Sequence, residues 1–161
     1  MTSGVMVIMS LLRNEGAMDN KGLITEYPFI LPRNVFTDKV SDTYDYSYTL
    51  LDDMPKGWKK AFGEQLCAEL KEVLVEDNLL DDYRVIQIKE KFGQLRWYDN
   101  YGSEKLYKVI DKYESLSEHT CIECGCEGKM KDLFGWISPY CDKCYKKVKR
   151  SVEERLTKYS K

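Results

Sequence analysis

The sequence contains very little histidine, with a single residue, His119, in a chain of 161. Histidine is the most frequent general base in enzymes, and metal-dependent nucleases usually pair it with an open metal position. The sequence also has no glycine-rich phosphate-binding loop and no nucleophile with a base at a suitable spacing. These absences argue against an enzyme, and we expect the protein to act without catalysis.

No apolar run in the sequence is long enough to span a bilayer, which requires about 20 residues. An apolar stretch near the N-terminus, Val5–Leu12, is much shorter, follows no basic residue and precedes no convincing cleavage site. We therefore expect residues 1–18 to be a flexible extension, with Met18 as an alternative start. Neither export nor a membrane partner is expected.

The chain also lacks a strong excess of charge of either sign, since 25 Lys and Arg residues stand against 27 Asp and Glu residues. A formal net charge of −2 gives no whole-chain indication of a nucleic-acid partner. The distribution is uneven, because residues 141–161 carry eight basic and three acidic side chains, which leaves −7 for residues 1–140. This basic tail is either a solvated helix face or a phosphate-binding surface. The basic residues nearest its start are Lys143, Lys146, Lys147, Lys149 and Arg150.

Six cysteines are present, and four of them form two Cys-x-x-Cys pairs. The pairs, Cys121/Cys124 and Cys141/Cys144, are separated by sixteen residues, which is the spacing of a four-cysteine zinc site. Four thiolates complete a tetrahedron and leave no position for water or substrate, so the zinc would be structural. Metal spacing in place of a disulfide framework indicates a reducing cytosol.

The residues after the second pair indicate the type of zinc module. Apolar residues recur at helical intervals there: Tyr145, Val148, Val152, Leu156 and Tyr159. A knuckle at the first pair, a hairpin within residues 129–140 and a ligand-bearing helix would form a treble clef, whereas a zinc ribbon would continue as a strand. The four-cysteine set is complete without His119 or Cys126, which lie beside the first pair, so neither is expected to be a ligand.

Residues 19–54 are expected to be extended, because Pro28 and Pro32 interrupt helices. Tyr44, Tyr46 and Tyr48 alternate with small or acidic residues as in a strand. Such a stripe usually packs against its own core. If exposed beside the surrounding aspartates, it would instead form a protein-binding surface.

A helix, a hairpin and a second helix are expected to complete an α+β core over residues 19–118. The first helix opens at Asp53-Met-Pro55 and runs to about Glu76, and one apolar face is formed by Trp58, Phe62, Leu66, Leu70 and Val73. Strands over residues 83–89 and 95–98 are joined by a reversal at Gly93. Ser103 caps the second helix, and residues 119–161 form the zinc module.

Three segments carry a resemblance to a known group: residues 57–63 (GWKKAFG), residues 88–99 (IKEKFGQLRWYD), and the zinc module at residues 119–121 (HTC) and 135–141 (GWISPYC). Together they resemble uncharacterised small proteins encoded by bacteriophages and prophages, over roughly residues 27–144. The resemblance implies a phage-derived accessory protein in the cytoplasm of a bacterial host cell. It implies no activity, and the helix after Cys144 lies outside it.

The function expected from these observations is that of a zinc-binding interaction protein. Its partner would be a host or defence protein, contacted through the acidic tyrosine segment. The alternative is a nucleic-acid-binding module that uses the five basic residues at the start of the last helix. Phosphate contacts would make such binding strongly salt-dependent.

Overall fold

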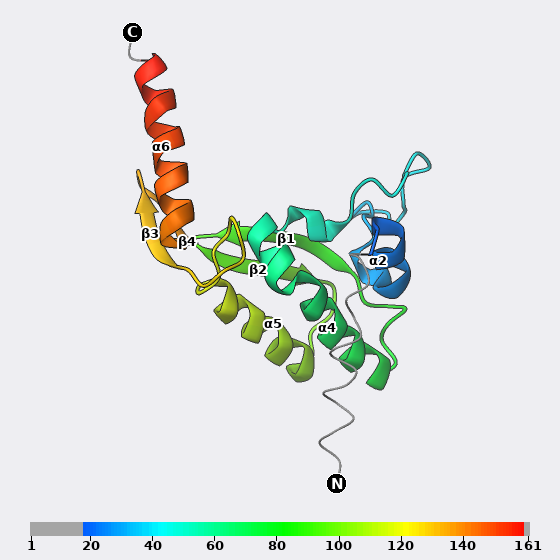
Figure 1. Cartoon of the computed structure of the whole chain (residues 1–161). Coiled ribbons are helices and arrows are strands. Elements are labelled where there is room, and N and C mark those ends of the chain that lie inside the picture. The colour runs from blue at the N-terminus through cyan, green and yellow to red at the C-terminus, as the bar shows by residue number, and fades with distance from the viewer. Residues whose placement is uncertain (1–17, 160–161) are drawn as a thin grey trace.

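The structure, a computed structural model, describes residues 18–159 and combines helices with two small antiparallel sheets (Figure 1). Its helices are α2 (Asn20–Glu26), α3 (Lys56–Trp58), α4 (Glu64–Glu76), α5 (Glu104–Ser117) and α6 (Asp142–Tyr159). The first sheet pairs β1 (Val85–Lys91) with β2 (Gln94–Asp99), and the second pairs β3 (Lys129–Leu133) with β4 (Trp136–Tyr140). The expected mixture of helix and sheet is therefore confirmed. The predicted extension over residues 1–18 lies, apart from Met18, outside the described residues.

The first expected helix forms, although its start differs from the prediction. Helix α3, a π-helical turn over Lys59–Gly63 and α4 make one helical stretch that ends at Glu76. The predicted cap at Asp53 is wrong, because Asp53 ends a 3₁₀ turn and Pro55 stands at the N-cap of α3. The neighbouring Asp52 carboxylate accepts from the Thr49 backbone N–H at 2.7 Å and pairs with the Lys59 ammonium, so the 3₁₀ turn has its own cap.

One face of this helical stretch is buried, as its apolar spacing predicts. Trp58, Phe62, Leu66 and Leu70 all belong to the hydrophobic core, and Val73 is half-buried against it. Full burial of a large apolar side chain is worth about 1.5–3 kcal/mol. This stripe is therefore a main source of stability for the core.

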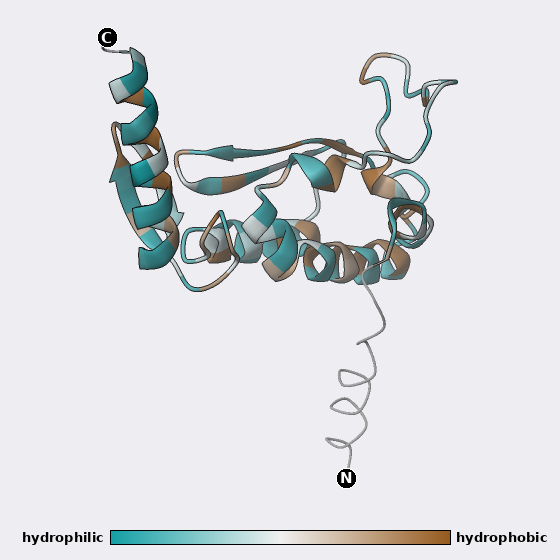
Figure 2. Ribbon diagram, turned by 45° about the horizontal axis from the view of Figure 1, so that its top comes forward, coloured by the Kyte–Doolittle hydropathy of each residue, from teal (hydrophilic) through white to brown (hydrophobic). Residues whose placement is uncertain are grey.

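The β1–β2 hairpin also follows the sequence pattern. Phe92 and Gly93 connect the strands with positive φ angles of 53° and 80°, which suits a tight two-residue turn. Leu95 and Trp97 are buried, whereas Tyr98 on the other face is exposed. In Figures 1 and 2 this hairpin forms one layer, and helices α4 and α5 form a second layer against it.

Helix α5 begins where the sequence predicts, since the Ser103 hydroxyl oxygen accepts from the Leu106 N–H at 3.2 Å. At its other end the Ser117 hydroxyl oxygen accepts from the Leu95 N–H of β2 at 2.9 Å. Tyr113 packs in the core and donates from its hydroxyl to Glu69 of α4 at 2.7 Å. These bonds fix α5 against both β2 and α4.

The expectation of an extended segment over residues 19–54 is wrong, because the segment contains a helix, two 3₁₀ turns (Pro28–Ile30 and Leu50–Asp53) and a bend at the tyrosines. Residues Asn20–Glu26 form helix α2, whose first turn is capped by the Asp19 carboxylate accepting from the Gly22 N–H at 2.8 Å. The predicted strand through Tyr44, Tyr46 and Tyr48 does not form. Tyr46 has a positive φ of 63° and the Tyr44 hydroxyl donates to the Tyr48 carbonyl, so the segment bends back on itself.

Candidate metal centre

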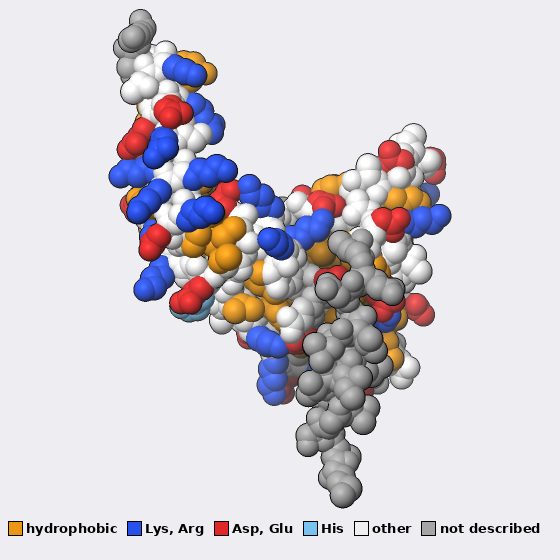
Figure 3. Space-filling model, viewed as in Figure 1, with side chains coloured by type: hydrophobic (Ala, Val, Ile, Leu, Met, Phe, Trp, Pro, Cys, Tyr) orange, Lys and Arg blue, Asp and Glu red, His pale blue; other side chains and the backbone are white. Residues whose placement is uncertain are grey.

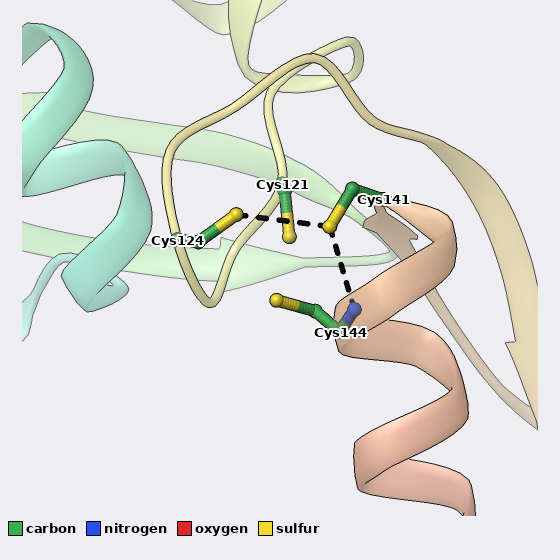
Figure 4. A group of neighbouring side chains, drawn as sticks. All are labelled: Cys121, Cys124, Cys141 and Cys144. Carbon is green, nitrogen blue, oxygen red and sulfur yellow. Dashed lines mark hydrogen bonds between the residues drawn. The ribbon is translucent and has the colours of Figure 1, made fainter.

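Four cysteine side chains converge at the C-terminal end of the core (Figure 4). The Sγ atoms of Cys121, Cys124, Cys141 and Cys144 all lie within 4.8 Å of one another, and those of Cys124 and Cys141 are 3.7 Å apart. Thiolates bound at about 2.3 Å to one tetrahedral ion are about 3.8 Å apart. The group therefore has the composition and dimensions of a site that can hold a metal ion.

The first pair lies in a tight turn. The Gly125 N–H donates to the Cys121 carbonyl at 3.0 Å, and Gly125 has a φ of +80°, which favours glycine. A Cβ at Gly125 would also lie 2.6 Å from the Gly57 carbonyl oxygen. Glycine is thus required here both by the turn and by the close approach of α3.

The two strongest shifts within the cluster affect Cys121 and Cys144. Burial opposes ionisation of Cys121, but backbone N–H groups of Cys141, Cys124 and Glu123 stabilise the thiolate and lower its pKa to about 7. Burial and hydrogen bonds to the neighbouring thiols raise the pKa of Cys144. Thiols that share one site titrate as a unit, and a cation among them favours the thiolate form of all of them.

The second pair stands at the start of α6. Cys141 directly precedes the helix, Cys144 lies in its first turn, and the Cys144 N–H points to the Cys141 sulfur at 3.4 Å. Unpaired N–H groups and the helix dipole stabilise negative charge at this end of a helix. The helix expected from the apolar spacing is therefore present, and Cys144 lies in its first turn.

Two other residues that could bind a metal, His119 and Cys126, lie outside the cluster. Among the described residues the metal-capable group contains the four cysteines and neither His119 nor Cys126, both of which are exposed. Their backbone carbonyls serve the turn instead, since His119 accepts from Gly128 at 2.8 Å and Cys126 accepts from Cys121 at 2.7 Å. The remaining cysteine, Cys67, is fully buried on α4, and burial raises the pKa of its thiol.

The first pair is docked on the hydrophobic core by α3. The Trp58 indole N–H donates to the Thr120 carbonyl at 2.7 Å, and the Gly57 N–H donates to the Ile122 carbonyl at 2.9 Å. A Cβ at Gly57 would collide with the Cys121 carbonyl oxygen and would lie 2.6 Å from the Ile122 carbonyl carbon. The sequence pattern placed Trp58 in the core stripe and gave no indication of its contact with the first cysteine pair.

A second set of contacts fixes the hairpin and the base of α6. The Tyr145 hydroxyl donates to the Asp132 carbonyl at 2.9 Å, and Lys131 of β3 pairs with Asp142. The Ile122 N–H donates to the Pro139 carbonyl of β4 at 3.0 Å, which joins this hairpin to the first cysteine pair. The metal-capable group therefore stands where the core, the β3–β4 hairpin and α6 meet.

Beyond its first turns, α6 leaves the rest of the molecule (Figure 1). None of its described side chains is fully buried. Lys and Arg side chains cover much of its visible surface in Figure 3, and the five predicted basic residues are all exposed. The adjacent hairpin exposes two aromatic side chains, Phe134 at 59% and Trp136 at 63%.

The described helices and the comparisons with known proteins complete the description of the chain. No helix among residues 18–159 is both long enough and apolar enough to cross a membrane. No protein-family model, curated protein or solved structure matches this chain.

Proposed function

We propose that Cys121, Cys124, Cys141 and Cys144 bind one structural zinc ion and that the protein acts by binding a macromolecule, without catalysis. A set of four thiolates with tetrahedral dimensions suits zinc, with an iron–sulfur centre as the other soft-ligand possibility. The order of knuckle, hairpin and ligand-bearing helix supports a treble-clef module. Four protein ligands close the coordination sphere, which supports a structural role.

The observation that carries a binding function is the construction of α6. Its N-terminus is held by the cysteine cluster and the hairpin, whereas its remaining turns bury no side chain. A helix with this little packing gains little stability from the core, because most helical stability in proteins comes from tertiary contacts. Its exposure is more easily explained by a partner than by a role in the fold.

Two classes of partner have support. A host or defence protein in the bacterial cytoplasm follows from the resemblance to phage-encoded proteins, and the exposed Phe134, Trp136 and Ile137 of the hairpin would suit it. The acidic tyrosine segment gives it partial support, because Tyr46 and Tyr48 are exposed, whereas Tyr44 is half-buried and hydrogen-bonded within its own loop. Nucleic acid is favoured by the basic surface of α6.

The metal and binding functions are tested together. Protein purified without added metal should contain about one zinc ion per chain by elemental analysis, and replacement of Cys121 by Ser should remove it. Immobilised protein, with and without chelator, is then offered a bacterial lysate that has or has not been treated with nuclease. Partner capture that depends on the metal supports the proposal, whereas capture unaffected by chelation contradicts it.

A further inference from the structure

We propose that the basic face of α6, formed by Lys143, Lys146, Lys147 and Arg150, binds the phosphate backbones of double-stranded DNA. The inference rests on the proposed function, since the metal cluster holds the base of this helix. The inference assigns one class of partner, double-stranded DNA, to the basic face of α6.

The four cations share one side of the helix. Their spacing of three, four and seven residues places them on a common face. Tyr145 and Val148 belong to the other side, where Tyr145 is hydrogen-bonded to the hairpin and Val148 is half-buried. The basic face therefore points away from the rest of the protein, and all four side chains are exposed.

These cations form no close ion pairs among the described residues. None of the four forms an ion pair within 4.0 Å across residues 18–159. Asp142, the nearest acid in sequence, is paired with Lys131 and also attracts Lys146 at longer range. Lys143/Lys147 and Lys146/Arg150 are like-charge pairs four residues apart, which destabilise a helix. A solvated helix face normally alternates the sign of its charges. A polyanion would neutralise the repulsion between the cations on this face.

The second half of α6 shows the ordinary solvated pattern. Glu153 and Glu154 are followed there by Arg155 and Lys158, so charges of both signs are present. The change of pattern within one helix confines the phosphate-binding surface to the first two or three turns. These are also the turns that the cysteine cluster and the hairpin hold in place.

The shape of α6 suits a duplex. An α-helix is about 10–12 Å wide with its side chains, and the major groove of B-DNA is about 12 Å wide. The 18 residues of α6 extend over about 27 Å, and Figure 1 shows that the helix projects from the body.

Single-stranded nucleic acid fits this surface less well. Its binding usually combines cations with aromatic side chains on which bases stack. The exposed Trp136 and Phe134 belong to the hairpin, which contacts the Tyr145 side of α6. Stacking residues and cations are therefore on different sides of the helix.

The test measures fluorescence anisotropy of a labelled 20-base-pair duplex with zinc-loaded full-length protein. Lys143→Gln, Lys147→Gln and Arg150→Gln are combined in one variant. Its matched control carries Lys39→Gln, Lys60→Gln and Lys108→Gln, which remove the same charge from exposed positions elsewhere. Circular dichroism verifies that both variants retain the helix content of the wild type.

For about four phosphate contacts, the slope of log K against log salt should be about −3.6 for the wild type. In the α6 variant the magnitude of this slope should fall by about 3. The variant should bind the duplex at least about tenfold more weakly than the wild type at 0.1 M salt, whereas the affinity of the control should stay within about twofold of the wild type. Equal weakening of both variants, or tighter binding of single-stranded than of duplex DNA, would overturn the inference.

Failure of the inference can be distinguished from failure of the proposed function. If the protein does not bind duplex DNA even at low salt but captures a nuclease-resistant protein in a metal-dependent manner, the inference is overturned and the proposed function stands. If chelation changes neither DNA binding nor capture, the proposed function is itself overturned, together with the metal-held helix on which the inference rests.

Discussion

The indole N–H of Trp58 donates a 2.7 Å hydrogen bond to the carbonyl oxygen of Thr120, 62 residues further along the chain. Trp58 is fully buried, so this bond joins the hydrophobic core directly to the segment that carries the first cysteine pair. Replacing Trp58 by Phe should therefore leave the Thr120 carbonyl without its partner and destabilise the protein by about 1–3 kcal/mol. Urea unfolding measures the difference. Trp136→Phe, at an exposed position, is the control and should change stability by less than about 0.5 kcal/mol.

Gly57→Ala should be harmful because a Cβ there meets backbone atoms and not a flexible side chain. We expect a loss of about 1–3 kcal/mol, typical of overpacking, together with weaker zinc retention against a chelator. Gly63→Ala tests whether the effect is specific, because its Cβ would have ordinary contacts of 3.5 Å or more with Leu51 and Lys59. That variant should be neutral or slightly stabilising, as for Gly→Ala at a compatible helical position. Equal destabilisation of the two variants would contradict the role assigned to Gly57.

Removal of the metal should unfold the C-terminal part of the chain first. Structural zinc contributes on the order of 10 kcal/mol of apparent folding free energy in small modules. Hydrogen exchange in the presence of a chelator should therefore lose protection over residues 120–145 before it loses protection in α4 and α5. His119→Ala and Cys126→Ser serve as controls that should keep both the zinc and the protection, since neither residue belongs to the cluster.

Alkylation should distinguish the three kinds of cysteine. In the zinc-loaded protein Cys126 should react first, because it is exposed and lies outside the cluster. Cys67 should react only on unfolding, since it is fully buried and burial raises the pKa of its thiol. The four cluster cysteines should become reactive on chelation, which mass spectrometry of the digested protein would show. Rapid labelling of Cys121 in the presence of zinc would contradict its assignment as a ligand.

The link between α4 and α5 should depend on pH. Burial opposes ionisation of Glu69, but hydrogen bonds from the Lys112 ammonium and the Tyr113 hydroxyl hold its pKa below the ordinary value of 4.5. Because the pKa is lower in the folded than in the unfolded state, the stabilisation is present above the unfolded-state pKa and is lost as the pH falls through the folded-state value. Glu69→Gln should therefore lower the free energy of unfolding at pH 7, and its deficit should shrink towards pH 3. Glu104→Gln, in an exposed ion pair with Lys108, is the control and should change stability little at either pH.

The features that could be predicted from the sequence depend on local patterns. The reversal at Phe92-Gly93, the Ser103 cap and the two cysteine pairs are each specified by a few neighbouring residues. Helix α2 could not be recognised in this way, because it has only seven residues. Its support is tertiary, with Leu23 and Ile24 in the core and Glu26 paired to Lys71 of α4 at 2.8 Å.

The tyrosine segment and the docking of the cysteine knuckle show two other limits. Alternation through Tyr44–Tyr48 matches the period of a strand, but the positive φ of Tyr46 prevents an extended chain there. The contact of Gly57 with residues 121 and 122 is non-local, and a single sequence carries no signal of which helix start receives the knuckle. The cluster itself was predictable from spacing, whereas its attachment to the core was not.

The position of Gly57 and Trp58 also has a consequence for synthesis of the protein. A ribosome releases the N-terminal part of a chain first, so the surface that receives the knuckle emerges more than sixty residues before the knuckle itself. Cys144 emerges last of the four cysteines, twenty residues after Cys124. We therefore expect zinc capture to be completed only after the surface that receives the knuckle has formed, as a late step of folding.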